Sequence, residues 1–183
     1  MLERLGFSFT KARTCTLETW SIFDGVGGKV LNELDLRNAE KDFGTPLRTV
    51  HRVDLHAELV RLATASDASS FPPVDLRIGS PVSEARPDGT VILQDGSEHS
   101  ADLIVGADGL RSVVRPAVVD TGAESTPVHS GQSAFRFLVD TSTLQKTSHL
   151  AELTAKNKGR LCLFADIKET ERERHMIWYG CRE

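Results

Sequence analysis

The sequence of 183 residues predicts a mixed α/β protein, and three observations lead to this fold class. Residues 102–115 read as a short apolar strand, a glycine-containing turn and the start of a helix, a pattern typical of parallel sheets. Residues 52–65 carry apolar side chains at helical spacing. Other segments alternate apolar and polar residues or flank glycine turns, as antiparallel strands do. The sequence therefore predicts strands of both kinds together with helices.

The first 50 residues predict the end of a helix, two strands and a connection. Residues 1–7 read as a helix end, because leucines three residues apart are followed by a glycine that stops it. Residues 16–36 predict two strands around the glycine turn at 24–28, DGVGG. This turn is not a nucleotide-binding glycine loop, since a strand rather than a helix resumes after it. Residues 39–49 are polar, contain glycine and proline, and predict a connection.

The clearest predicted helix spans residues 52–65. Leu55, Leu59 and Leu62 recur at i, i+4 and i+7, which places them on one face. An apolar stripe of this kind predicts a helix packed against a core. Residues 64–73 (TASDASSFPP) follow it and predict a loop from their composition.

The second half of the chain predicts mainly strands. Residues 74–82 alternate apolar and polar side chains, and residues 90–104 predict a hairpin around the turn Gln94-Asp95-Gly96. Residues 103–105 then predict a buried strand, 106–109 a turn and 110–115 a helix start. The remaining predicted elements are a loop at 121–133, a strand at 134–139, a helix at 144–155, a strand at 161–167, a solvated loop at 168–174 and a strand at 175–179.

The turn at residues 106–109 is the first candidate binding site. Gly106 and Gly109 let the backbone turn sharply and approach another group closely. The first N–H groups of a helix lack intrahelical partners and favour negative charge. Strand, turn and helix start together predict a place for a phosphate or diphosphate. An ordinary strand-to-helix connection explains the same residues, and spacing alone does not separate the two interpretations.

Charge and composition narrow the classes of partner. The 22 basic and 26 acidic residues give a net charge of −4, so no basic field recruits nucleic acid or an anionic membrane. Cys15, Cys162 and Cys181 are far apart, and the six histidines show no metal-ligand spacing. No stretch approaches the roughly 20 apolar residues of a membrane helix. We therefore expect a cytoplasmic protein with no metal, nucleic-acid or membrane partner; the sequence leaves its oligomeric state open.

Two stretches resemble motifs of FAD-dependent aromatic hydroxylases. Residues 106–115 (GADGLRSVVR) resemble their second nucleotide-contacting motif, and residues 51–56 (HRVDLH) with Leu59 resemble their H-R-x-D-L-x-x-x-L helix start. Within this family they resemble fungal salicylate-hydroxylase-like monooxygenases with the p-hydroxybenzoate hydroxylase fold. The resemblance runs along most of the chain but covers only the middle of such a protein. It implies a partial Rossmann-like FAD-binding domain with a β-meander and part of an antiparallel substrate-domain sheet.

The resemblance also implies domains and cofactor contacts. Residues 1–118 would be a partial FAD-binding domain without the family's first βαβ unit, with residues 15–36 contributing to the substrate-side sheet. Residues 119–183 would be a truncated substrate domain. The implied cofactor residues are Arg52 reaching the FAD, Val82 near the adenine, Asp108 and Gly109 beside the cofactor, and Arg111 offsetting phosphate charge. Surface arginines, a core valine and an ordinary turn are the alternative interpretations of these residues.

The candidate substrate residues are His175 and Tyr179. Their even spacing places them on one face of a strand. They resemble an H-x-x-x-Y element that lines the aromatic substrate's pocket in some relatives, where the histidine could accept a phenolic proton. A strand-edge histidine and a packing tyrosine are the alternative.

The implied function is hydroxylation of a salicylate-like aromatic acid with FAD, dioxygen and NADH or NADPH. The 183 residues lack the family's diphosphate loop and ribityl-binding motif, so FAD binding should be weak. We therefore expect that this chain alone does not retain FAD and does not hydroxylate. Two alternatives stay open. One is a non-catalytic binding fragment derived from a flavoprotein, and the other is an FAD oxidoreductase that is not a hydroxylase.

Overall fold

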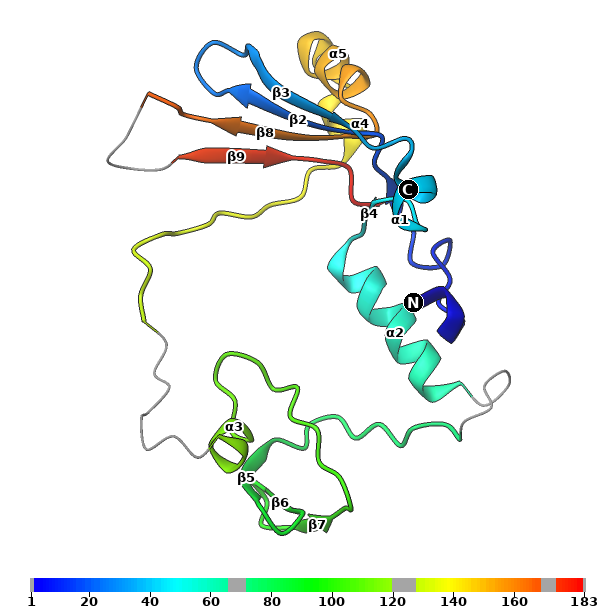
Figure 1. The fold of residues 1–183 in the computed structure, drawn as a ribbon, viewed down its shortest axis with the longest axis vertical. Coiled ribbons are helices and arrows are strands. Elements are labelled where there is room, and N and C mark those ends of the chain that lie inside the picture. Colours follow the sequence, from blue (N-terminus) through cyan, green and yellow to red (C-terminus); the bar gives the residue numbers. More distant parts are fainter. Residues whose placement is uncertain (1, 66–71, 120–127, 169–173, 183) are drawn as a thin grey trace. The chain divides into compact units, whose positions relative to one another are not determined.

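The computed structural model describes residues 2–65, 72–119, 128–168 and 174–182. The chain forms two compact units, one made of residues 1–74 with 137–183 and the other of residues 75–136. Helices and several separate sheets occur among them (Figure 1), so the predicted mixed α/β class is confirmed. The predicted division at residue 118 separates cofactor and substrate roles, and it stays a prediction.

The first unit contains a four-stranded sheet in the order β3-β2-β8-β9 (Figure 1). Its strands are β2 (Thr19–Asp24), β3 (Val30–Asp35), β8 (Arg160–Ala165) and β9 (His175–Trp178). The expected antiparallel pairing holds for β2 with β3 and for β8 with β9. The pairing of β2 with β8 is instead parallel. A parallel pair needs a long crossover, and here the chain between the two strands includes the whole second unit.

The β2–β3 hairpin is confirmed around the predicted glycine turn. The Asp24 backbone N–H donates to the Lys29 carbonyl at 2.8 Å, and its carboxylate accepts the Val26 N–H at 3.1 Å. On the other side of β2, the Phe23 ring stacks on Phe164 of β8 with centroids 4.9 Å apart. Hydrogen bonds within the turn therefore stabilise the hairpin, and the stacking of Phe23 on Phe164 stabilises its pairing with β8.

A polar cluster links the three strands β3, β2 and β8. The Arg160 guanidinium donates to the Ser21 hydroxyl at 2.8 Å and to the Glu33 carboxylate. The Ser21 hydroxyl donates to the same carboxylate at 3.1 Å, and Ser21 is fully buried. On the same face, the buried Cys162 thiol donates to Asn157 at the end of α5 (Ser148–Lys156), and burial raises the pKa of that thiol.

Helix α2 (Arg52–Thr64) confirms the predicted helix, but its most buried side chain is Glu58. Glu58 is 3% exposed, whereas Leu59 of the predicted apolar stripe is 40% exposed. The Glu58 carboxylate accepts the Ser8 N–H at 2.8 Å and two N–H groups of Arg61 at 2.7 Å each. These contacts lower its pKa from 4.5 to about 2, with the Arg61 hydrogen bonds as the main cause.

Short elements complete the first unit. The predicted helix end is a 3₁₀ turn, η1 (Leu2–Leu5), closed by Gly6 at φ +83°. The connection predicted at 39–49 differs, because it contains helix α1 (Ala39–Phe43) and strand β4 (Arg48–Thr49), which pairs with β1 (Cys15–Thr16). Helix α4 (Thr141–Leu144) precedes α5, so the helix predicted at 144–155 is confirmed with shifted bounds.

The second unit contains the predicted β-meander. Its strands are β5 (Val82–Arg86), β6 (Thr90–Leu93) and β7 (Glu98–Ser100), all paired antiparallel. Glycines with positive φ occupy both turns, Gly89 at +88° and Gly96 at +85°. Helix α3 (Arg115–Val118) follows.

Three predicted strands are wrong. Of the strand predicted at 74–82 only Val82 lies in a strand, and residues 103–105 and 134–139 lie outside strands. Leu103 and Phe135 are 78% and 94% exposed. The apolar patterns of these segments are those of strands inside a sheet. Among the described residues, however, no neighbouring strand pairs with them, so their backbone groups gain no ladder of hydrogen bonds.

The loops predicted at 64–73, 121–133 and 168–174 fall partly outside the described residues, at 66–71, 120–127 and 169–173. In the described part of the chain, no helix combines the length and the apolar character that crossing a membrane requires.

Candidate functional site

The start of α2 and the chain that follows β9 meet in a polar cluster. The Arg182 guanidinium donates to both carboxylate oxygens of Asp54, at 2.6 and 2.7 Å, and its Nη2 also lies 3.1 Å from His51 Nδ1. We call these three side chains the Arg182 cluster. Beside it, the Thr49 hydroxyl donates to the Gly180 carbonyl oxygen. Residues 128 positions apart in the sequence are thereby joined.

The electrostatics of the Arg182 cluster follow from these bonds. The hydrogen bond from Arg182 lowers the pKa of Asp54, and the same bond raises the pKa of Arg182. A guanidinium only donates, so a hydrogen bond between Arg182 Nη2 and His51 Nδ1 requires this ring nitrogen to accept. The cluster therefore joins one cation and one anion beside an imidazole ring.

Arg52, the predicted cofactor arginine, is the first residue of α2. Its side chain is exposed, and within the described residues it makes no hydrogen bond or ion pair. Its neighbours His51 and Asp54 are held by Arg182, whereas its own guanidinium points to no partner in the described chain. The Arg52 guanidinium is therefore exposed to solvent, and its predicted contact with a cofactor stays a prediction.

One face of the four-stranded sheet is apolar and partly exposed. The strand register places His175 opposite Ala165, Ile177 opposite Leu163, and Ile22 beside Leu163. The apolar side chains of this face, which we call the apolar sheet face, are Trp20, Ile22, Leu34, Leu161, Leu163 and Ile177, with His175 at its edge. Trp20, Ile22, Asn32 and Leu34 line a small hollow of about 140 Å³ on it. A face of this composition suits a flat aromatic molecule.

The candidate substrate residues border this face. His175 is the first residue of β9 and is exposed. Tyr179 follows the last residue of β9, is 46% exposed, and directly precedes Gly180, which Thr49 holds. The strand therefore carries His175 at one end and leads through Tyr179 into the Arg182 cluster at the other.

In the second unit, Asp108 organises the predicted glycine turn. Its carboxylate accepts the Ser112 hydroxyl, the Val113 N–H at 2.6 Å and the Val114 N–H at 3.1 Å. The pKa of Asp108 falls to about 2, mainly through the Ser112 hydrogen bond. The helix predicted from Leu110 is therefore wrong at its start: α3 begins at Arg115, because Asp108 holds the preceding residues in a loop. The amides of Val113 and Val114 are already bound to a carboxylate.

The two glycines of this turn differ in surroundings. A Cβ at Gly106 would come within 2.8 Å of Val114, so Gly106 permits close packing inside the loop. At Gly109, φ is +75° and a Cβ would meet nothing within 4 Å. Arg111 is exposed as well, and within the described residues its side chain makes no hydrogen bond or ion pair. Gly109 and Arg111 thus form the open side of the loop.

Replacing Asp108 by asparagine is expected to loosen this loop. The variant loses the charge that attracts the two amides, and exchange of the Val113 and Val114 amides should rise about tenfold. Because the folded pKa lies below the ordinary 3.8, the ordering is complete above that pH and is lost as the pH falls toward about 2. Amide chemical shifts followed by NMR down the acid range measure this.

Asp102→Asn is the matched control, because Asp102 is an exposed aspartate six positions earlier in the same segment. Equal exchange rates in the two variants would contradict the role given to Asp108.

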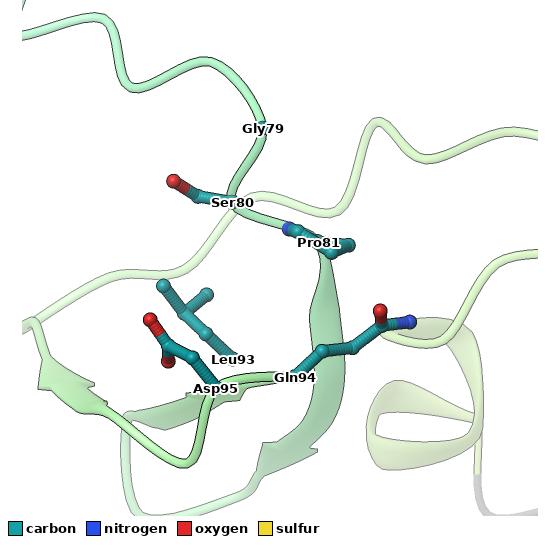
Figure 2. A pocket seen from close by; sticks show the side chains of 6 residues that line it. All are labelled: Gly79, Ser80, Pro81, Leu93, Gln94 and Asp95. Carbon is teal, nitrogen blue, oxygen red and sulfur yellow. The ribbon is translucent and has the colours of Figure 1, made fainter.

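A pocket of about 330 Å³ lies where β5 begins (Figure 2). Its lining residues are Gly79, Ser80, Pro81, Leu93, Gln94 and Asp95. Figure 2 shows the Asp95 and Leu93 side chains directed toward Ser80. The Asp95 carboxylate is held by the N–H and hydroxyl of Ser97, which lowers its pKa. Val82 follows Pro81 and pairs with Leu93, so the predicted adenine contact borders this pocket without lining it.

Arg52, His175 and Tyr179 lie in the first unit, and Val82, Asp108, Gly109 and Arg111 lie in the second. Sequence reasoning missed Arg182, whose only sign in the sequence is its place three residues after Tyr179. In the described ranges, no three His, Cys, Asp or Glu side chains gather as metal ligands.

Comparison with known proteins finds similarity along most of the chain. Hispidin-3-hydroxylase of Neonothopanus nambi is 38% identical over 135 residues, which cover 73% of this chain and 31% of that protein. FAD-dependent monooxygenase phomE of Diaporthe leptostromiformis is 30% identical over 172 residues, 91% of this chain and 44% of that protein. 3-Hydroxybenzoate 6-hydroxylase of Klebsiella oxytoca is 30% identical over 148 residues, 78% of this chain and 35% of that protein.

Among solved structures, Klebsiella pneumoniae HpxO complexed with FAD and uric acid is 28% identical, with a TM-score of 0.47. The match covers 63% of this chain and 28% of that chain. No protein-family model matches the chain. The chain thus spans between about a third and less than half of the length of the curated relatives.

Proposed function

We propose that this chain, which is related in sequence along most of its length to FAD-dependent aromatic monooxygenases, forms part of an enzyme that hydroxylates a small aromatic acid. The substrate class is salicylate-like, and NADH or NADPH is the electron donor. Residues 1–118 serve mainly the cofactor and residues 119–183 mainly the substrate, in the cytoplasm.

The observation that supports this most directly is the junction between the two candidate motifs. The H-R-x-D-L helix start implies a cofactor contact, and the H-x-x-x-Y strand implies a substrate contact. Arg182 with Asp54, and Thr49 with Gly180, join the helix start to the chain that leaves this strand. A monooxygenase needs its cofactor and its substrate in one place.

The donor chemistry of the described residues fits FAD. Arg52 in the first unit and Arg111 in the second each present an exposed guanidinium group, and such a group suits a phosphate as donor and countercharge. Val82 contributes backbone polar groups beside the adenine, and Gly109 leaves room for close approach. Bound FAD would supply the oxygen-activating chemistry.

The substrate side is served by the apolar sheet face and its two bordering residues. The face offers apolar contacts to one side of an aromatic ring. His175 accepts the phenolic proton, which makes the ring more nucleophilic. Tyr179 orients the substrate through its hydroxyl.

An NMR titration of the chain with FAD tests the proposal. We expect weak binding that perturbs the amides of residues 52–55 and 107–111, and Arg52→Gln should reduce the affinity about tenfold through loss of a charge-assisted hydrogen bond. Arg77→Gln is the matched control, because Arg77 is an exposed arginine paired with Asp75. Riboflavin, which lacks the diphosphate, should not distinguish the two variants.

FAD that leaves both segments unperturbed, or that binds both variants equally, would contradict the proposal and favour a non-catalytic fragment. Salicylate added next should change the fluorescence of Trp20 on the apolar sheet face. FAD binding without any salicylate response would favour an FAD oxidoreductase that is not a hydroxylase.

A further inference from the structure

We propose that Arg182 is a positioning residue that holds the chain leaving β9 and the start of α2 as one rigid element. Arg182 thereby sets the position of Tyr179 relative to Arg52. The roles of Tyr179 and Arg52 rest on the proposed function; the contacts of Arg182 do not depend on it.

The geometry of the Arg182 cluster restricts movement of both segments. Two parallel N–H···O bonds to one carboxylate fix the plane of the guanidinium as well as its distance. The contact of Nη2 with His51 Nδ1 adds a third anchor from the residue that precedes Arg52. Asp54 and His51 flank Arg52 in the sequence, so Arg182 holds the helix start on both sides of it.

The need for such an anchor follows from the position of β9 in the sheet. β9 is an edge strand that pairs with β8 alone among the described strands, and the last paired residue is Trp178. Beyond it, residues 179–182 have no ladder partner in the described chain. Two contacts hold them: the Thr49 hydroxyl, three residues before α2, donates to the Gly180 carbonyl oxygen, and the Arg182 cluster joins them to the helix start. Tyr179 therefore lies between a paired strand and an anchored segment.

The pair Arg37–Asp35 provides a comparison within the same unit. It also has two N–H···O bonds, at 2.9 and 2.7 Å, but it joins residues only two positions apart. Its side chains are 69% and 50% exposed, whereas the Asp54 side chain is 15% exposed. The two pairs thus have the same hydrogen-bonding pattern, but of these two only the pair Arg182–Asp54 connects segments far apart in the sequence.

Tyr179 is the only tyrosine of the chain, so 3-fluorotyrosine gives a single ¹⁹F resonance at the position of interest. We expect Arg182→Gln to shift and broaden this resonance and to raise hydrogen exchange at the Leu55 amide, which closes the first turn of α2, about tenfold. Arg37→Gln should leave both unchanged. Arg182→Lys should give an intermediate result, because an ammonium cannot bind two oxygens in a plane.

A merely structural role would lower the unfolding midpoint of the first unit without a separate effect at Tyr179. Trp20 and Trp178 report that midpoint by fluorescence, and we expect Arg182→Gln to change it little compared with the shift of the tyrosine resonance. Asp54→Asn, which removes the other partner, should reproduce the shift.

An unchanged Tyr179 resonance in Arg182→Gln and Asp54→Asn would overturn the inference. A Tyr179 resonance and a Leu55 exchange rate in Arg182→Lys equal to those of the unsubstituted chain would overturn it as well. These measurements are made without FAD. Failure of the later FAD titration would therefore reject the proposed function and leave the positioning role of Arg182 as measured.

Discussion

Replacing Glu58 by alanine is expected to lower the unfolding free energy of the first unit by about 2–3 kcal/mol, because it removes three hydrogen bonds to a buried carboxylate. Glu58 is 3% exposed and accepts three hydrogen bonds, one from Ser8 and two from Arg61. Arg61 also donates to the Gly6 carbonyl at 3.2 Å. The substitution therefore releases the N-terminal segment from α2 as well as removing an ion pair.

Urea unfolding followed by tryptophan fluorescence measures this effect, because both tryptophans, Trp20 and Trp178, lie in the first unit. Asp35→Ala is the matched control: it breaks a similar two-bond pair with Arg37 that is exposed, and exposed pairs contribute about 1 kcal/mol or less. If Glu58→Ala and Asp35→Ala lowered the unfolding free energy equally, the burial of Glu58 would make no separate contribution to stability.

The same carboxylate predicts an acid dependence of stability. Its pKa in the folded protein is about 2, below the ordinary 4.5, so its contribution is fully present above about pH 4.5. The contribution is lost as the pH falls toward about 2. Glu58→Gln should lose this part of the pH dependence, which unfolding midpoints measured across the acid range will reveal.

Replacing Gly89 by alanine is expected to destabilise the β-meander by about 3 kcal/mol or more. Gly89 has φ +88°, and a Cβ there would come within 2.5 Å of the Ala101 carbonyl oxygen. That oxygen belongs to the backbone, and the Ala101 N–H donates to the Gly89 carbonyl at 3.0 Å, so the two segments cannot separate without losing this bond. Left-handed strain of about 1–2 kcal/mol adds to the clash.

Gly96→Ala isolates the two causes. Gly96 closes the other turn of the meander with a similar φ of +85°, but a Cβ there would meet nothing within 4 Å. We expect a loss of about 1 kcal/mol from backbone strain alone. Hydrogen exchange of the amides in β6 compares the variants, and equal protection in both would refute the steric argument.

Sequence reasoning succeeded where the information is local. The turn at 24–28, the turn at Gly96 and the periodicity of α2 each specify an element within a few residues, and all three elements form as predicted. The strands predicted at 74–82, 103–105 and 134–139 did not form, apart from Val82, because an apolar alternating pattern gains stability only from neighbouring strands. No pattern in the segment itself contains that information.

The candidate site divides in the same way. Arg52, His175 and Tyr179 were found because their motifs are short and contiguous, and their functional roles stay predictions. Arg182 and Glu58 were missed, since each acts through partners far away in the sequence, 128 positions for Arg182 with Asp54 and 50 for Ser8 with Glu58. Periodicity identifies which face of a helix is covered, but not that a carboxylate will be buried there with its own arginine.

The parallel pairing of β2 with β8 has a consequence for synthesis on the ribosome. The β2–β3 hairpin has all its residues once position 35 has emerged, but β8 ends only at Ala165. At about 5–20 residues per second, the nascent chain waits on the order of ten seconds between these events. Throughout this interval one edge of β2 has no partner, and other nascent chains could pair with it.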